Sequence, residues 1–119
     1  MTSIGVDIVE IERVESAIKR EGGRFLGRIY TEAELRTCQG RFSSLASRFA
    51  AKEAVMKVLG IGGIGIAWRE IEILTGEDGR PSVKLYGHAL NKAEELNLKE
   101  LSVSLSDSKQ NAVAVAIAI

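Results

Sequence analysis

The residues most able to do chemistry lie in one stretch, Ser47 to Gly60, whose pattern predicts a helix. At about 100° per residue, Lys52 falls within the apolar stripe that begins at Leu45. A buried lysine is unfavourable unless other groups compensate its charge. Glu53 and Lys57 follow at i, i+4 spacing, so a carboxylate and an ammonium project side by side. The alternative is an exposed Glu–Lys pair, with the Lys52 ammonium reaching water past the apolar surface.

A further charged residue, Asp7, interrupts a predicted strand from Ser3 to Glu10. The β-branched residues around it suit a pleated, half-buried surface. If the strand alternates, one face carries Ile4, Val6 and Ile8, and the other carries Gly5, Asp7 and Val9. The carboxylate then lies beside a bare glycine backbone, which leaves room for a ligand or another element. The alternative is that Asp7 closes the strand or caps the helix after it.

The elements that must position these residues are mostly helical in the first half of the chain. Periodicity predicts a helix from about Ile11 to Arg20 and a short one from Arg24 to Tyr30, separated by Gly22-Gly23. A capping box over Thr31 to Glu34 predicts a third helix, which fades near Gln39-Gly40. Ser43-Ser44 then opens the long helix, and Gly60 ends it.

The second half of the chain has mainly strand patterns. They predict a hairpin of Ala67 to Thr75 and Pro81 to Tyr86, a helix from Gly87 to Leu96, and strands from Leu101 to Ser106 and Ala112 to Ile119. This order predicts a single α+β domain over residues 1–119, with a mainly antiparallel sheet packed against a long central helix and smaller helices. Glycines 60, 62 and 65 have G-x-G-x-x-G spacing, but they follow a helix and precede a strand, the reverse of a dinucleotide-binding fingerprint.

The last predicted strand is apolar on both faces. Val113, Val115, Ile117 and Ile119 alternate with alanines at 112, 114, 116 and 118. A strand of this kind must be covered on both sides. We expect the larger residues to fill the core of the chain and the alanines to let the backbone of another subunit approach.

Composition excludes several classes of protein. Sixteen basic residues balance sixteen acidic ones, so nucleic acid and anionic membranes are not expected partners. The single Cys38 excludes an intramolecular disulfide, and the single His88 excludes a multi-histidine metal site. No basic segment followed by an apolar run opens the chain, and no stretch approaches the roughly 18 apolar residues of a membrane span. These features predict a cytoplasmic protein.

Two motifs are specific when they are taken together. They are Gly5-x-Asp7, with Glu10 and Arg13 after it, and Arg48-Phe49-x-x-Lys52-Glu53-x-x-x-Lys57. The chain resembles the holo-acyl-carrier-protein synthases, the small members of the phosphopantetheinyl transferase superfamily, essentially end to end. The resemblance implies a phosphopantetheinyl transferase-like fold. It also implies transfer of the 4′-phosphopantetheine arm of coenzyme A to a serine of an acyl carrier protein, as used in fatty acid biosynthesis, with release of adenosine 3′,5′-bisphosphate.

The resemblance also implies residue roles. Asp7 and Glu53 are the expected magnesium ligands, in keeping with a metal that takes one or two protein carboxylates beside phosphates. Lys57 is the expected catalytic lysine, which stabilises charge on the departing oxygen. The expected coenzyme A contacts are Arg48, Lys52, Gly62, Gly63 and Ser106. The proton of the attacking serine passes either to a metal-bound water or to Glu53, and the sequence leaves both open.

The sequence leaves two interpretations open for the arginines of the first two predicted helices and for Asp107. Arg13, Arg20 and Arg24 are expected to dock the acidic carrier protein, but they alternate with glutamates and also fit a solvated face. Many relatives carry histidine where this chain has Asp107, and an aspartate cannot donate to a phosphate unless it is protonated. Asp107 therefore fits a turn-capping residue better.

The resemblance implies a homotrimer in which neighbouring subunits share the site. The competing interpretations are a non-catalytic module that binds coenzyme A or a nucleotide, and a purely structural oligomerisation domain. Neither of them explains why Asp7 and Glu53 are carboxylates.

Overall fold

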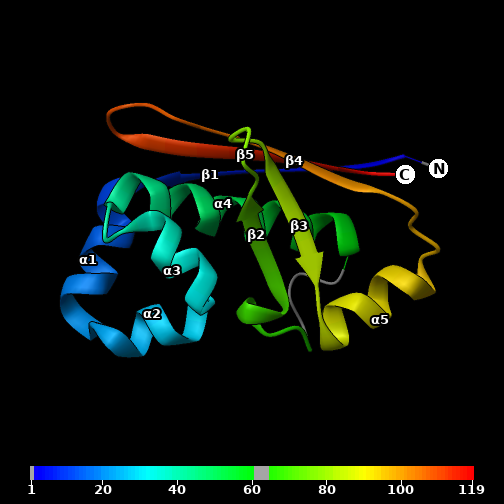
Figure 1. The fold of residues 1–119 in the computed structure, drawn as a ribbon, viewed down its shortest axis with the longest axis horizontal. Coiled ribbons are helices and arrows are strands. Elements are labelled where there is room, and N and C mark those ends of the chain that lie inside the picture. Colours follow the sequence, from blue (N-terminus) through cyan, green and yellow to red (C-terminus); the bar gives the residue numbers. More distant parts are fainter. Residues whose placement is uncertain (1, 61–64) are drawn as a thin grey trace.

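The computed structural model describes residues 2–60 and 65–119 and has the expected α+β architecture (Figure 1). The first half contains β1 (Ser3–Glu10), α1 (Ile11–Glu21), α2 (Gly23–Ile29), α3 (Glu32–Cys38) and α4 (Phe42–Leu59). The second half contains the short 3-10 helix η1 (Trp68–Glu70), β2 (Ile71–Thr75), β3 (Pro81–Leu85), α5 (Gly87–Glu95), β4 (Leu101–Asp107) and β5 (Asn111–Ala118). The predicted strand at 67–75 is thus shorter, because its first residues form η1.

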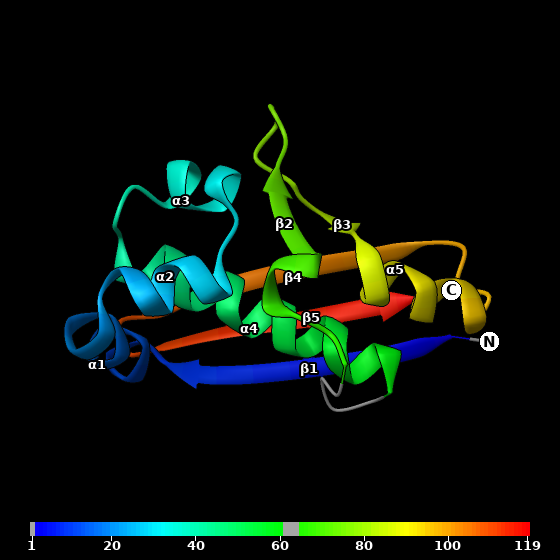
Figure 2. The ribbon, with the colours of Figure 1, turned by 90° about the horizontal axis from the view of Figure 1, so that it is seen from below.

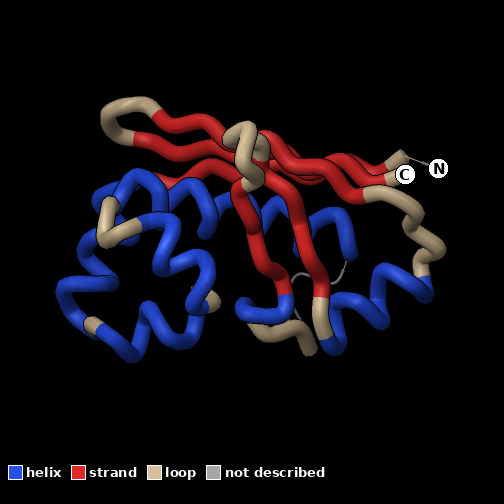
Figure 3. Tube along the Cα trace, viewed as in Figure 1, coloured by secondary structure: helices blue, strands red, loops and turns tan. Residues whose placement is uncertain are grey.

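The strands form two antiparallel sheets. The larger has the order β1-β5-β4, with Asp7 opposite Ala114 on β5, and the smaller is the β2–β3 hairpin. Among the described residues, helices lie on one face of the larger sheet only, and they leave its other face open (Figures 1 and 3). In the view of Figure 2, α4 follows the strands of this sheet, and the β2–β3 hairpin projects away from it.

Helix α4 is the centre of the core because it is buried around most of its circumference. It contacts β1 and β5 on one side, and α1, α3 and β2 on others. A helix in this position is covered by other elements on most sides, so its residues are mainly apolar. Lys52 is therefore surrounded by buried neighbours although its side chain is charged. Gly60 ends the helix in the left-handed conformation at φ 79°. Within residues 2–60 and 65–119, no helix combines the length and apolar character needed to cross a bilayer.

The two faces of β5 are the reverse of our expectation. Alanines 112, 114, 116 and 118 are at most 1% exposed and face α4, whereas the larger β5 residues lie on the open face. Small side chains let the helix approach the sheet closely, and Gly5 on β1 serves the same purpose opposite Ala54. The open face therefore carries Ile4, Val6 and Ile8, which are 68%, 52% and 66% exposed.

Candidate active site

Three of the expected catalytic and metal-binding residues meet where β1 lies against α4. The Lys57 ammonium on α4 donates to the Val6 carbonyl oxygen at 2.7 Å and to Asp7 Oδ1 at 3.3 Å. The close approach of β1 to α4 makes this contact possible, because Gly5 has no side chain to hold the two elements apart. The bond to the Val6 carbonyl fixes the position of the ammonium independently of its ion pair with Asp7.

Glu53 lies one turn before Lys57 and faces the same space. Burial raises the pKa of the Glu53 carboxyl, and the negative charge of Asp7 raises it further, while Lys57 and Arg13 act in the opposite direction. A carboxylate that is partly desolvated beside another carboxylate favours a positive partner. The geometry therefore concentrates negative charge between β1 and α4.

An open cleft of about 840 Å³ lies beside these groups. Its lining combines Asp7 and Glu53 with Arg13 and Arg20 of α1, and with the rings of Phe25 and Phe49. Oxygen donors on an accessible cleft suit a hard divalent cation such as magnesium, which needs only one or two protein carboxylates when phosphate oxygens and waters complete its shell. Among the described residues, this site included, no group of three or more His, Cys, Asp or Glu side chains is placed to hold a metal ion.

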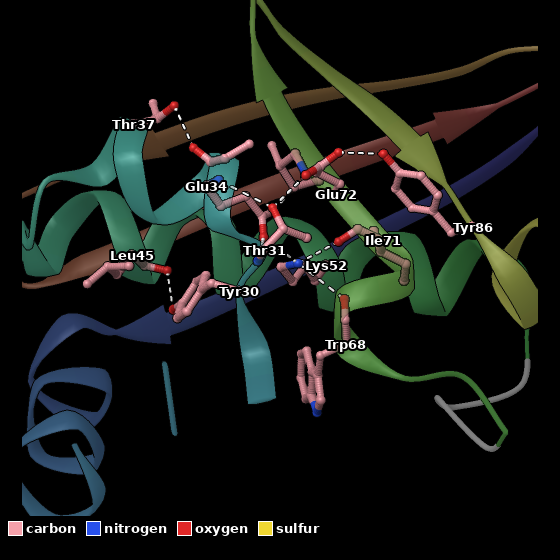
Figure 4. A network of polar contacts seen from close by, with 12 residues as sticks. Tyr30, Thr31, Glu34, Thr37, Leu45, Lys52, Trp68, Ile71, Glu72 and Tyr86 are labelled. Atoms are coloured by element: carbon pink, nitrogen blue, oxygen red, sulfur yellow. Dashed lines mark hydrogen bonds and ion pairs between the residues drawn. The ribbon is translucent and has the colours of Figure 1, made fainter. Parts of the chain in front are cut away.

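Lys52 does not face this cleft, and the expectation that it contacts coenzyme A is wrong for this structure. Its side chain is 0% exposed and pairs with Glu34 at 2.8 Å. The ammonium also donates to the carbonyl oxygens of Trp68 and Ile71 (Figure 4). All three ammonium protons therefore have acceptors inside the protein, which is how α4 holds a lysine in its apolar surroundings.

Arg48 and Ser106 also lie apart from the cleft. Arg48 is about 180° round the helix from Lys57, and its guanidinium donates to Thr75 Oγ1 at 2.8 Å at the end of β2. Ser106 is exposed on β4, which β5 separates from β1. Within one chain, neither residue reaches the reacting groups. Gly62 and Gly63 lie outside the described residues.

Only some of the basic residues expected to dock the carrier protein lie at the cleft. Arg13 and Arg20 line the cleft, whereas Arg24, at the start of α2, is exposed and is not part of the lining.

In the β4–β5 turn, the Asn111 amide donates to Ser108 Oγ at 3.2 Å, so Ser108 caps the turn. Asp107 is instead the last residue of β4, paired with Ala112.

Sequence reasoning missed the aromatic side of the cleft. The rings of Phe25 and Phe49 stack with centroids 6.3 Å apart, and Phe49 stacks on Trp68 at 4.8 Å. Phe49 belongs to the apolar stripe of α4, and that position in the sequence predicts a core residue. Its i, i+4 spacing from Glu53 was the available signal that it lies beside the carboxylate.

Comparison with known proteins defines the class. A family model described as the 4′-phosphopantetheinyl transferase superfamily matches residues 3–118. A holo-[acyl-carrier-protein] synthase of Dehalococcoides mccartyi is 51% identical over 118 residues, which cover 99% of this chain and 98% of that protein. One of Herpetosiphon aurantiacus is 45% identical over 124 residues, covering 98% of each.

Solved structures of holo-[acyl-carrier-protein] synthases are also similar to this chain. The crystal structure of Helicobacter pylori holo-[acyl-carrier-protein] synthase in complex with coenzyme A is 34% identical, with a TM-score of 0.89, covering 98% of this chain and 99% of that one. The enzyme from Neisseria meningitidis is 38% identical, with a TM-score of 0.87 and 98% and 97% coverage.

The chain belongs to the 4′-phosphopantetheinyl transferase superfamily. Its similarity to the curated relatives over nearly the full length of both chains makes it a transferase of the holo-acyl-carrier-protein synthase type. The expected family and fold class are both confirmed.

Proposed function

We propose that the enzyme transfers the 4′-phosphopantetheine group of coenzyme A to a serine of an acyl carrier protein in a magnesium-dependent reaction. The observation that carries this proposal is the meeting of Asp7, Glu53 and Lys57 beside one open cleft. The coenzyme A complex of the Helicobacter pylori enzyme supports coenzyme A as the substrate. We place the reaction in the cytoplasm, where it would serve fatty acid biosynthesis.

Asp7 and Glu53 are the proposed magnesium ligands, since they supply hard oxygen donors from two different elements. When bound, magnesium would offset the negative charge of the pyrophosphate and orient it. Arg13 and Arg20 line the same cleft, so phosphate oxygens would meet positive charge on the α1 side as well.

The reaction itself exchanges the phosphoanhydride bond of the coenzyme A pyrophosphate for a phosphate ester bond. The serine Oγ of the carrier protein forms a bond to the phosphorus that bears pantetheine, and the bond from that phosphorus to the bridging oxygen breaks. Adenosine 3′,5′-bisphosphate leaves with the electron pair of that bond. Lys57, fixed by the Val6 carbonyl, supplies positive charge for the oxygen that departs. Glu53 is our preferred acceptor of the serine proton, because its carboxylate lines the cleft where the reacting groups would meet.

We further propose that the enzyme is a homotrimer. The open face of the β1–β5–β4 sheet exposes Ile4, Val6, Ile8, Ile117 and Ile119, which are 41–68% exposed. Contiguous apolar surface of this kind favours association with another subunit. Assembly would also allow Arg48 and Ser106, which do not reach the cleft of their own chain, to contact coenzyme A bound to a neighbour.

Mass spectrometry of an apo acyl carrier protein incubated with coenzyme A and magnesium tests the reaction. We expect a mass increase equal to one phosphopantetheine group. Asp7→Ala and Glu53→Ala should both abolish it with magnesium in excess. Binding of coenzyme A without any mass increase would instead support a non-catalytic module, and near wild-type turnover in both variants would refute the metal assignment.

A further inference from the structure

A capping box and a buried lysine meet in the core of this protein. Glu34 Oε1 accepts the Thr31 amide at 2.8 Å, as the capping box requires, and lies 2.8 Å from the Lys52 ammonium. Glu34 Oε2 accepts the Ile73 amide of β2 at 2.7 Å. The side chains of Glu34 and Lys52 are both 0% exposed. One carboxylate thus connects α3, α4 and β2 (Figure 4).

The contacts of Lys52 extend this connection to η1. Its ammonium donates to the Trp68 carbonyl oxygen at 3.1 Å and to that of Ile71. Burial lowers the pKa of Lys52, and the charge and hydrogen bond of Glu34 oppose that shift. Because desolvation largely offsets the attraction within a buried ion pair, such a pair is weak evidence for stability. Its hydrogen bonds, in contrast, set the position of the backbone that accepts them.

Trp68 transmits this position to the cleft. Its indole stacks on Phe49 with centroids 4.8 Å apart and ring planes 23° apart. Phe49 stacks in turn on Phe25 at 6.3 Å, and both phenylalanine rings line the cleft beside Glu53. The Trp68 carbonyl is held by Lys52, so the ring that supports Phe49 from behind is anchored to the ion pair.

We propose that Glu34 and Lys52 are positioning residues for the transferase site, acting through Trp68 on the aromatic side of the cleft. This inference rests on the proposed function for the identity of the cleft. Lys52 touches no substrate in this proposal. It fixes η1 against α4, so that the Trp68–Phe49–Phe25 stack holds the cleft open at the width that the reacting arm requires.

The test uses the double variant Glu34→Gln/Lys52→Met beside the two single variants. Each single change leaves one buried charge without its partner, which is strongly destabilising. The double change removes both charges, so it should unfold at a higher temperature than either single variant. It still lacks the ammonium that held the Trp68 carbonyl, and the site should therefore remain disturbed.

Two measurements separate positioning from stability. Trp68 is the single tryptophan, so its emission wavelength and acrylamide quenching report on this position directly. We expect the double variant to keep a red-shifted, more readily quenched emission and a kcat/KM for coenzyme A lowered roughly 10- to 100-fold, the cost typical of small misplacements near a reacting group. Wild-type emission and kcat/KM in a stable double variant would overturn the proposal.

Trp68→Leu removes the indole without touching the ion pair and keeps the test valid if the other variants do not fold. It should lower kcat/KM for coenzyme A as the double variant does, and the two effects should not add. Full activity of Trp68→Leu would overturn the proposal. The matched control is Lys92→Met/Glu95→Gln, which removes a pair on α5 at 3.8 Å whose side chains are 30% and 70% exposed, and it should leave emission and kcat/KM unchanged. If the wild type itself performs no transfer, the proposed function fails, while the emission data still decide whether the pair positions Trp68.

Discussion

Gly5 offers a direct test of how β1 and α4 create the site. A Cβ atom at this position would clash with the Ala54 carbonyl oxygen and lie 3.2 Å from both the Ala54 carbonyl carbon and Lys57 Cβ. Two of these three atoms belong to the backbone of α4, so no side-chain rotation relieves the contact. Gly5→Ala must therefore push β1 away from the helix, and with it Asp7 from Lys57.

The expected loss of stability follows from two opposing effects. Overpacking of this kind costs about 1–3 kcal/mol, whereas restricting the unfolded chain by replacing glycine contributes about 0.4–1 kcal/mol in the other direction. The clash is larger, so the midpoints of the two ranges give a net loss of about 1.3 kcal/mol. The unfolding entropy is roughly 2.1 cal/mol/K per residue. For a chain of 119 residues, a loss of 1 kcal/mol in the free energy of unfolding therefore lowers the melting temperature by about 4 °C. The melting temperature should then fall by about 5 °C.

Thermal unfolding followed by circular dichroism measures this change, and turnover measured well below the transition should fall at least about tenfold, because the Lys57–Asp7 geometry is lost. The control is Gly27→Ala in α2, where no described atom other than those of its two chain neighbours and the nearby backbone of its own helix lies within 4 Å of the added Cβ. That change should raise the melting temperature by about 2–4 °C, since alanine favours a helix by roughly 0.5–1 kcal/mol. A Gly5→Ala protein that melts at or above the wild-type temperature would refute the reasoning.

The other predictions concern chemistry, docking and assembly. Lys57→Ala should lower kcat much more than it changes the KM for coenzyme A, because its charge acts mainly in the transition state; steady-state kinetics measure this. Arg13→Glu should weaken carrier-protein binding and its salt dependence, as titrations at increasing ionic strength would show. Ile8→Lys should break up the oligomer, because Ile8 is 66% exposed on the open sheet face; light scattering reports the mass.

Each of these predictions has an outcome that contradicts it. A Lys57→Ala enzyme altered only in KM would remove Lys57 from the catalytic role. Carrier affinity that is unchanged by Arg13→Glu and insensitive to salt would exclude this surface from docking. A wild-type enzyme that is fully active as a monomer would refute the homotrimer and the shared site. The control for adding a charge is Ser82→Lys at an exposed position of β3, which should leave the oligomer intact.

Local patterns in the sequence were sufficient for the elements and for part of the site. Period-two alternation located β1, and the Thr31–Glu34 capping box located the start of α3, because both depend on near neighbours in the chain. The i, i+4 spacing of Glu53 and Lys57 placed both side chains on one side of α4, where the structure has them beside Asp7.

Only the tertiary structure decided which way the ambiguous residues face. An apolar stripe containing a lysine is compatible with a ligand contact or with a buried ion pair, and the choice depends on Glu34, which lies 18 residues earlier in the chain. Likewise, β5 is apolar on both sides, so its alternation cannot say which side meets α4. The close approach of the helix at Gly5 requires the alanines there, and this sends the larger residues of β5 to the open face. Contacts between segments that are distant in the sequence determine which face of an element is buried. Local periodicity contains no information about those contacts.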